Sequence, residues 1–97
     1  MADPARPDVS PVTVRLWASA RAAAGESTVV VEVPGPVSVA WLRSELVRRH
    51  PRGGQLDPVL KVCSVLVGDR PLGTADPATV QVEPGGTVEF LPPFAGG

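Results

Sequence analysis

The sequence ends with the stretch Thr87-Val88-Glu89-Phe90-Leu91-Pro92-Pro93-Phe94-Ala95-Gly96-Gly97. Its first part, residues 87–91, is predicted to be a strand. Two prolines restrict the backbone after it, so residues 92–97 are expected to form an extended tail that points away from the sheet. The Gly96-Gly97 pair has no Cβ atoms and can enter a narrow channel. We therefore expect Gly97 to present its α-carboxylate to the active site of another protein.

Two strands are predicted near the start of the chain. Residues 12–17 alternate between apolar and polar side chains, which places Val12, Val14 and Leu16 on one face. Trp17 lies on the other face and is expected to be a partly covered residue at an edge. Residues 27–33 are rich in β-branched valine and form the second strand of an antiparallel hairpin.

An alanine-rich connection joins these two strands. Residues 18–25 are expected to form one helical turn that closes at Gly25 in the left-handed conformation. The next element is a longer helix over residues 39–50. Ser38 is a suitable N-cap for it, and Pro51 ends it, because a residue before proline avoids the helical region. Apolar residues recur along this helix at Val39, Leu42 and Leu46.

The second half of the chain alternates between turns and strands. Asp57 and Pro58 predict a cap and a first helical position for a short helical turn. Residues 62–67 predict a third strand, residues 70–78 an irregular segment, and residues 79–82 a short strand. The whole order indicates an α+β roll, in which one main helix covers a mixed sheet of four or five strands. The first and last strands are expected to lie side by side in parallel, with the C-terminus at an edge.

Composition excludes several classes of function. The 97 residues make one domain, and nine basic against ten acidic residues give a net charge of −1. Nucleic-acid binding needs a concentrated basic face, which this balance does not provide. We find no signal peptide and no apolar run of the roughly 20 residues that a membrane helix needs, so a cytoplasmic location without membrane attachment is expected. The single cysteine fits a reducing compartment.

The usual catalytic and metal-binding patterns are absent from the sequence. The only histidine, His50, is expected at a helix end, and Cys63 is expected to pack as a small apolar group. A zinc site normally needs three or four ligands, and no such cluster is found, so no metal is expected. The Gly53-Gly54 and Gly85-Gly86 pairs lack the lysine of a phosphate-binding loop. The terminal carboxylate therefore remains as the unusual chemical group.

The C-terminal pattern resembles that of a known family. The pattern is Val82-x-x-Gly85-x-x-Val88-x-x-Leu91-Pro92-Pro93-Phe94-Ala95-Gly96-Gly97, and it resembles the ends of the MoaD/ThiS ubiquitin-like sulfur carriers, MoaD most of all. A weaker match is Val14-Arg15-Leu16-Trp17-Ala18 followed by Ala20-Arg21-Ala22-Ala23-Ala24-Gly25. The resemblance covers residues 12–97, and one departure is Gly86, where the family often carries aspartate.

This resemblance implies a β-grasp fold and a carrier cycle that needs partners. An adenylyltransferase similar to ubiquitin-activating enzymes would use ATP and Mg²⁺ to adenylate Gly97, and a sulfur donor such as a rhodanese would then leave a thiocarboxylate there. The large subunit of molybdopterin synthase, or another sulfur-accepting synthase, would receive the sulfur. The chain itself would bind no cofactor and would not be an enzyme alone.

The resemblance also divides the chain into parts. Residues 1–11 are expected to be a disordered proline-rich leader, residues 12–91 the β-grasp domain, and residues 92–97 the tail. Gly96 would keep the approach to Gly97 open, and a partner would bind the tail residues Leu91, Pro92, Pro93, Phe94 and Ala95. Phe94 would be an apolar anchor in the partner's channel.

Three alternatives remain open at this point. The sulfur could serve another pathway, such as thiamine, cysteine or a thiolated secondary metabolite. The chain could instead be a ubiquitin-like modifier that is joined to lysines, or a plain binding module.

Overall fold

The structure is a computed structural model that describes residues 10–50 and 55–93. The predicted leader, residues 1–11, therefore lies almost wholly outside the described residues. The elements in chain order are β1 (Val12–Leu16), α1 (Ala18–Ala24), β2 (Thr28–Val31), β3 (Val37–Ser38), α2 (Val39–Arg49), α3 (Leu56–Lys61), β4 (Ser64–Val67), β5 (Arg70–Pro71), β6 (Gln81–Val82) and β7 (Thr87–Leu91).

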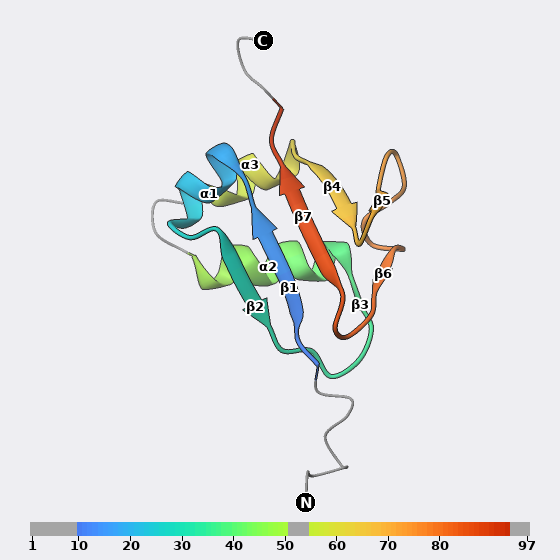
Figure 1. The fold of residues 1–97 in the computed structure, drawn as a ribbon. Helices are drawn as coiled ribbons and strands as arrows, with labels where there is room; N and C mark the ends of the chain where they lie inside the picture. The colour runs from blue at the N-terminus through green and yellow to red at the C-terminus, as the bar shows by residue number, and fades with distance from the viewer. Residues whose placement is uncertain (1–9, 51–54, 94–97) are drawn as a thin grey trace, which may run out of the picture.

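Five of the strands form one mixed sheet in the order β2-β1-β7-β4-β5 (Figure 1). β1 and β7 run parallel, whereas the pairs β1–β2, β4–β7 and β4–β5 are antiparallel. The predicted hairpin and the parallel first and last strands are thus confirmed. The expected edge position is wrong for β7, because this strand lies in the middle of the sheet with β1 on one side and β4 on the other. The short strands β3 and β6 pair separately.

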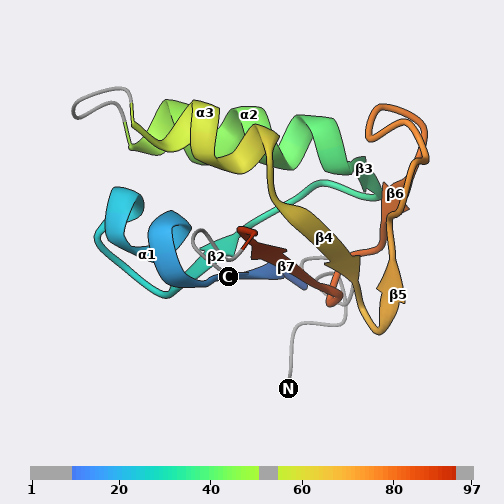
Figure 2. The same ribbon diagram turned by 90° about the horizontal axis from the view of Figure 1, so that it is seen from above.

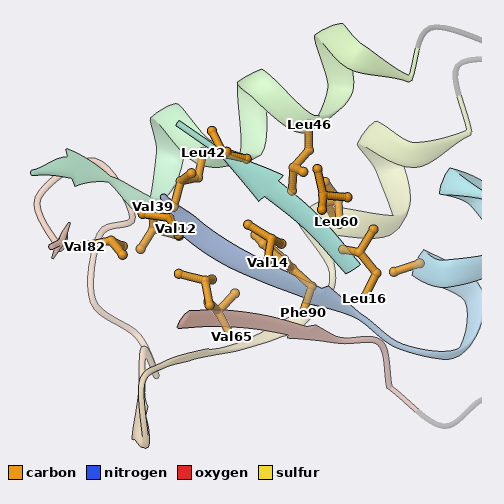
Figure 3. Close-up of a cluster of buried hydrophobic side chains, with 14 of the residues drawn as sticks. Val12, Val14, Leu16, Val39, Leu42, Leu46, Leu60, Val65, Val82 and Phe90 are labelled. Atoms are coloured by element: carbon orange, nitrogen blue, oxygen red, sulfur yellow. The ribbon is translucent and has the colours of Figure 1, made fainter. Parts of the chain in front are cut away.

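Helices α2 and α3 lie on one face of the sheet, as Figure 2 shows from above. The inward side chains of β1 and β7 form the core beneath them. Figure 3 shows this cluster, in which Val14 and Phe90 are completely buried. The predicted core face of the first strand is confirmed, because Val12, Val14 and Leu16 are all buried. The α+β architecture with a mixed sheet follows from this packing.

The main helix begins and packs as its sequence predicts. Ser38 is the N-cap, and its Oγ accepts a hydrogen bond of 2.9 Å from the Trp41 backbone N–H. Val39, Leu42 and Leu46 are buried against the sheet. The exposed side carries an ion-pair network in which Glu45 accepts from Arg48 and Arg49.

The boundaries around α3 differ from the prediction. The helix begins at Leu56 with Gln55 at the N-cap, and Asp57 pairs with Lys61 one turn later instead of capping the helix. β4 begins at Ser64, not at residue 62, because the Val62 and Cys63 N–H groups donate to carbonyls of α3. Hydrogen bonds that close the helix therefore shorten the strand.

Three further differences concern short elements. Arg70–Pro71 was expected to be irregular but pairs with β4 as the edge strand β5. β2 ends at Val31, two residues earlier than predicted, although Val33 is still buried. The connection after β1 is a helix of seven residues, α1, which exceeds the single turn predicted, and Gly25 closes it at φ 81° as expected.

A tight turn leads into β7. Pro84 and Gly85 are its central residues, Gly85 has φ 86°, and the Gly86 N–H donates to the Glu83 carbonyl at 2.9 Å. Proline followed by a glycine with positive φ is typical of a type II turn. Gly86, the position of the family departure, has little room for a side chain, because an added Cβ would lie 3.0 Å from the Glu83 oxygen.

Candidate functional site

The start of the tail continues directly from the central strand. Leu91 is the last residue of β7, is partly exposed, and is the register partner of Ser64 in β4. The preceding residue, Phe90, is fully buried, and its carbonyl accepts from the Trp17 N–H at 3.3 Å. Because β7 is held on both sides and anchored by Phe90, the tail leaves the sheet at a fixed place.

The structure describes only the first two residues of the tail, Pro92 and Pro93. Pro92 is partly buried and Pro93 is exposed. The predicted anchor Phe94 and residues 95–97, including Gly96 and Gly97, lie outside the described residues. The site assignments for the tail therefore stay predictions.

A small polar and aromatic cluster lies beside the end of β7, on the sheet face that α2 and α3 leave uncovered. The indole Nε1–H of Trp17 donates to the Glu89 carboxylate at 2.9 Å. The Arg15 guanidinium carbon lies 5.4 Å from the centre of the Trp17 ring, a cation–π distance. Trp17 is 40% exposed, so this ring is held in place and still open to contact. Trp17 is thus partly covered, as expected, but β1 is not an edge strand, because β2 and β7 flank it.

Sequence reasoning did not find this cluster. Arg15 and Glu89 are register partners across the parallel pair β1–β7. The alternation within each strand could have placed Arg15 and Trp17 on the outward face, but Glu89 joins them only through the parallel pairing of strands that are far apart in the sequence.

An apolar groove lies on the other side of the end of β7, next to the start of the tail. Its volume is about 610 Å³. β4 and the segment around β5 form its walls, and the end of β7 closes it. The lining residues are Cys63, Ser64, Val65, Leu66, Pro71, Leu72, Gly73, Leu91, Pro92 and Pro93. Leu91 and the two prolines thus border a surface that suits apolar side chains of another protein.

Cys63 and His50 have structural environments. The Cys63 thiol donates to the Val59 carbonyl at 3.2 Å, and burial raises its pKa to about 11, so it remains a thiol at neutral pH. The two ring nitrogens of His50 lie 2.7 Å from the Leu46 carbonyl and 2.6 Å from a Glu26 carboxylate oxygen. The ring therefore ties the end of α2 to the loop before β2.

Residues 10–50 and 55–93 contain neither a cluster of metal ligands nor a membrane-spanning helix. No group of three or more His, Cys, Asp or Glu side chains is placed there to hold a metal ion. Within the same ranges, none of the helices has the length and apolar character needed to cross a membrane.

Comparison with known proteins gives one family. The sequence model of the ThiS family matches residues 14–97. No curated protein matches the sequence significantly.

Solved structures give the same fold. The Haloferax volcanii protein HVO 2177 is similar with a TM-score of 0.73 at 20% identity, over 93% of this chain and 89% of that one. Small archaeal modifier protein 1 from Methanosarcina acetivorans has a TM-score of 0.70 at 18% identity, over 92% and 98%. A complex of subunits 1 and 2 of molybdopterin-converting factor from Helicobacter pylori has a TM-score of 0.60 at 23% identity, over 90% and 99%.

These structural neighbours establish the ubiquitin-like β-grasp fold that the resemblance implied. The family match begins within β1 and continues through the tail, so it includes the residues of the cluster and of the groove. The chain therefore belongs to the ThiS family, within the MoaD/ThiS group of ubiquitin-like sulfur carriers.

Proposed function

We propose that this chain is a sulfur carrier whose Gly97 carboxylate is adenylated and then converted to a thiocarboxylate. The observation that carries the proposal is the family match over residues 14–97, which includes the diglycine. The position of the tail supports it. β7 is the central strand. At its end, Leu91 and the two prolines lie between an exposed aromatic cluster and an apolar groove.

The chemistry explains why the chain needs an activating partner. An α-carboxyl group has a pKa of about 3.5, so it is ionised at neutral pH and is a poor electrophile. In the first step a Gly97 carboxylate oxygen attacks the α-phosphorus of ATP and displaces pyrophosphate. In the second step sulfur at the oxidation level of sulfide attacks the acyl carbon and displaces AMP. ATP and Mg²⁺ belong to the adenylyltransferase, and this chain supplies the carboxylate.

Each tail residue has a proposed role. Gly96 and Gly97 leave the reacting carbon unhindered, because neither has a Cβ. Pro92 and Pro93 restrict the backbone and reduce the entropy lost when the tail enters a partner. Leu91, Phe94 and Ala95 offer apolar contacts to the partner's channel.

Within the carrier class we propose molybdopterin biosynthesis, with this chain as the small subunit of molybdopterin synthase. The Leu-Pro-Pro-Phe-Ala-Gly-Gly ending and the fold of the Helicobacter pylori subunit complex favour this pathway. The acceptor would then be a large subunit that holds the pterin precursor. The thiamine, cysteine and secondary-metabolite pathways are the alternatives, and only the identity of the acceptor separates them.

Two variants of the tail test the carrier function. One lacks Gly97 and the other has an alanine appended after it. Both should fold as the native chain does, because the change lies beyond the described core, and both should fail in sulfur transfer. Full transfer by either variant with an active adenylyltransferase and sulfur donor would refute the proposal. Circular dichroism serves as the folding control.

A second function is favoured by one specific observation, the similarity to small archaeal modifier protein 1. A ubiquitin-like modifier would also be adenylated at Gly97, but its carbonyl carbon would end in an isopeptide bond to a lysine. Mass spectrometry of proteins from the native host separates the two functions. Branched peptides carrying the C-terminal residues of this chain on lysine would establish the modifier function.

A further inference from the structure

A second hollow lies at the same end of the sheet as the tail, on the opposite side of Trp17 from the apolar groove. Its volume is about 170 Å³, and its lining residues are Arg15, Leu16, Trp17, Arg21, Ser27 and Thr28. β1, α1 and the start of β2 supply these residues. Because β1 and β7 run parallel, the end of β1 and the start of the tail lie together, next to α1 (Figure 1).

Two arginine side chains line the hollow in the described part of the chain. Neither Arg15 nor Arg21 takes part in an ion pair there. The register partner of Arg15 is Glu89, but the Glu89 carboxylate accepts from the Trp17 indole, and Glu89 does not line the hollow. Arg15 lies against the ring of Trp17 instead.

These guanidinium groups are suited to binding a carboxylate. A guanidinium that lies over an aromatic ring keeps its N–H donors in its own plane, where they can form paired hydrogen bonds. The hydroxyl groups of Ser27 and Thr28 are further donors. Neither hydroxyl forms a hydrogen bond with another side chain or backbone group among the residues described. The net charge of the whole chain is −1, so this positive charge is local.

The apolar part of the lining indicates which kind of anion suits the hollow. The Trp17 ring, which is 40% exposed, gives it an apolar side, whereas the Leu16 side chain points into the core. A glutamate side chain carries a hydrocarbon stem that can pack there while its carboxylate meets the arginines. Inorganic phosphate has no apolar part and gains nothing from this wall.

We propose that the hollow binds a carboxylate side chain from an acidic segment of the adenylyltransferase that takes up the tail. This inference rests on the proposed function, because it assumes a partner that docks at the end of β7. The site would orient the chain so that the tail enters the partner from a defined side.

The binding chemistry can be tested without any partner. The full chain, labelled with ¹⁵N, is titrated at low ionic strength with a short oligoglutamate peptide blocked at both ends. We expect shifts of the Trp17 indole signal and of the Arg21, Ser27 and Thr28 amides, while the Trp41 indole on α2 stays unchanged. The affinity should fall about three- to tenfold in the Arg15→Gln/Arg21→Gln variant, as expected for two exposed ion pairs.

Matched controls make the result decisive. Arg70→Gln removes an exposed arginine outside the hollow and should leave the affinity unchanged. Arg21→Gln alone, on the exposed side of α1, replaces the double variant if that variant does not fold. Absence of peptide shifts, equal binding by Arg15→Gln/Arg21→Gln, or equal shifts with inorganic phosphate would each overturn the proposal.

A second experiment uses the adenylyltransferase. The Arg15→Gln/Arg21→Gln variant should show a KM for the chain raised about three- to tenfold with kcat unchanged, since the reacting carboxylate is untouched. An unchanged KM would overturn this inference while leaving the carrier function intact. A native chain that an active adenylyltransferase does not adenylate would instead refute the proposed function.

Discussion

The turn before β7 gives a sharp test of the fold. Gly85 has φ 86°, in the left-handed region, and an added Cβ would meet only the Ser10 Cβ at 3.5 Å. A Gly85→Ala substitution therefore has room for its methyl group, and its cost comes from the backbone. The left-handed conformation costs an alanine about 1–2 kcal/mol. Against this, alanine reduces the entropy of the unfolded chain, which stabilises by about 0.4–1 kcal/mol.

A matched substitution isolates the conformational cost. Gly35 lies in the bend between β2 and β3, its φ lies outside the left-handed region, and an added Cβ would meet no atom within 4 Å. Gly35→Ala should thus gain the same unfolded-state benefit without the strain. The two variants should differ by about 1–2 kcal/mol in the free energy of unfolding, with Gly85→Ala the less stable.

Urea unfolding followed by circular dichroism measures this difference. An asparagine tolerates the left-handed region better than alanine, so Gly85→Asn should recover part of the loss. Equal stability of Gly85→Ala and Gly35→Ala, or a more stable Gly85→Ala, would show that the turn does not have this geometry.

Three further predictions concern the core, the surface and the thiol. Leu42→Ala removes a fully buried side chain and should cost about 2–5 kcal/mol in urea unfolding, whereas Ser44→Ala on the exposed side should stay within about 0.5 kcal/mol. Hydrogen bonds from Arg48 and then Arg49 lower the Glu45 pKa from 4.5 to about 2, so its stabilising effect is complete above pH 4.5 and is lost as the pH falls towards 2. Glu45→Gln should accordingly flatten the decline in melting temperature over this range, and an unaltered decline would contradict the ion-pair network. Burial raises the Cys63 pKa to about 11, so alkylation by iodoacetamide at pH 8 should be much slower than that of a cysteine peptide, and equal rates would show an accessible thiolate.

Long elements with a clear pattern could be predicted from the sequence. The alternation in β1 and the helical spacing of Val39, Leu42 and Leu46 each identify a buried face, and both faces are buried in the structure. Ser38 also caps α2 as its side chain indicates. These features depend on neighbours in the sequence, which is why local pattern was sufficient.

Features that depend on distant neighbours could not be predicted in the same way. β3 and β5 contain two residues each, too few to show any periodicity, and each exists through its pairing partner. β7 is central because β4 pairs with it on the side opposite β1, and this pairing depends on a strand distant in the sequence. The hydrogen bond between Trp17 and Glu89 joins residues 72 positions apart, and so requires the parallel pairing of β1 and β7.

The tail shows the same contrast between local sequence pattern and contacts with distant residues. The sequence motif points to Gly97 as the reacting residue, and the structure adds the surroundings in which the tail begins at Leu91. The arginine hollow was not visible in the sequence, because its side chains come from β1, α1 and the start of β2.

Intact mass spectrometry of the full chain tests the carrier function most directly. The chain is incubated with an adenylyltransferase from the same organism, ATP, Mg²⁺ and sulfide, with the variant that lacks Gly97 as control. We expect a mass gain equal to one oxygen replaced by sulfur, mapped to the C-terminal peptide and absent from the control. An unchanged mass with an adenylyltransferase that modifies another diglycine carrier under the same conditions would contradict the proposal that Gly97 carries sulfur.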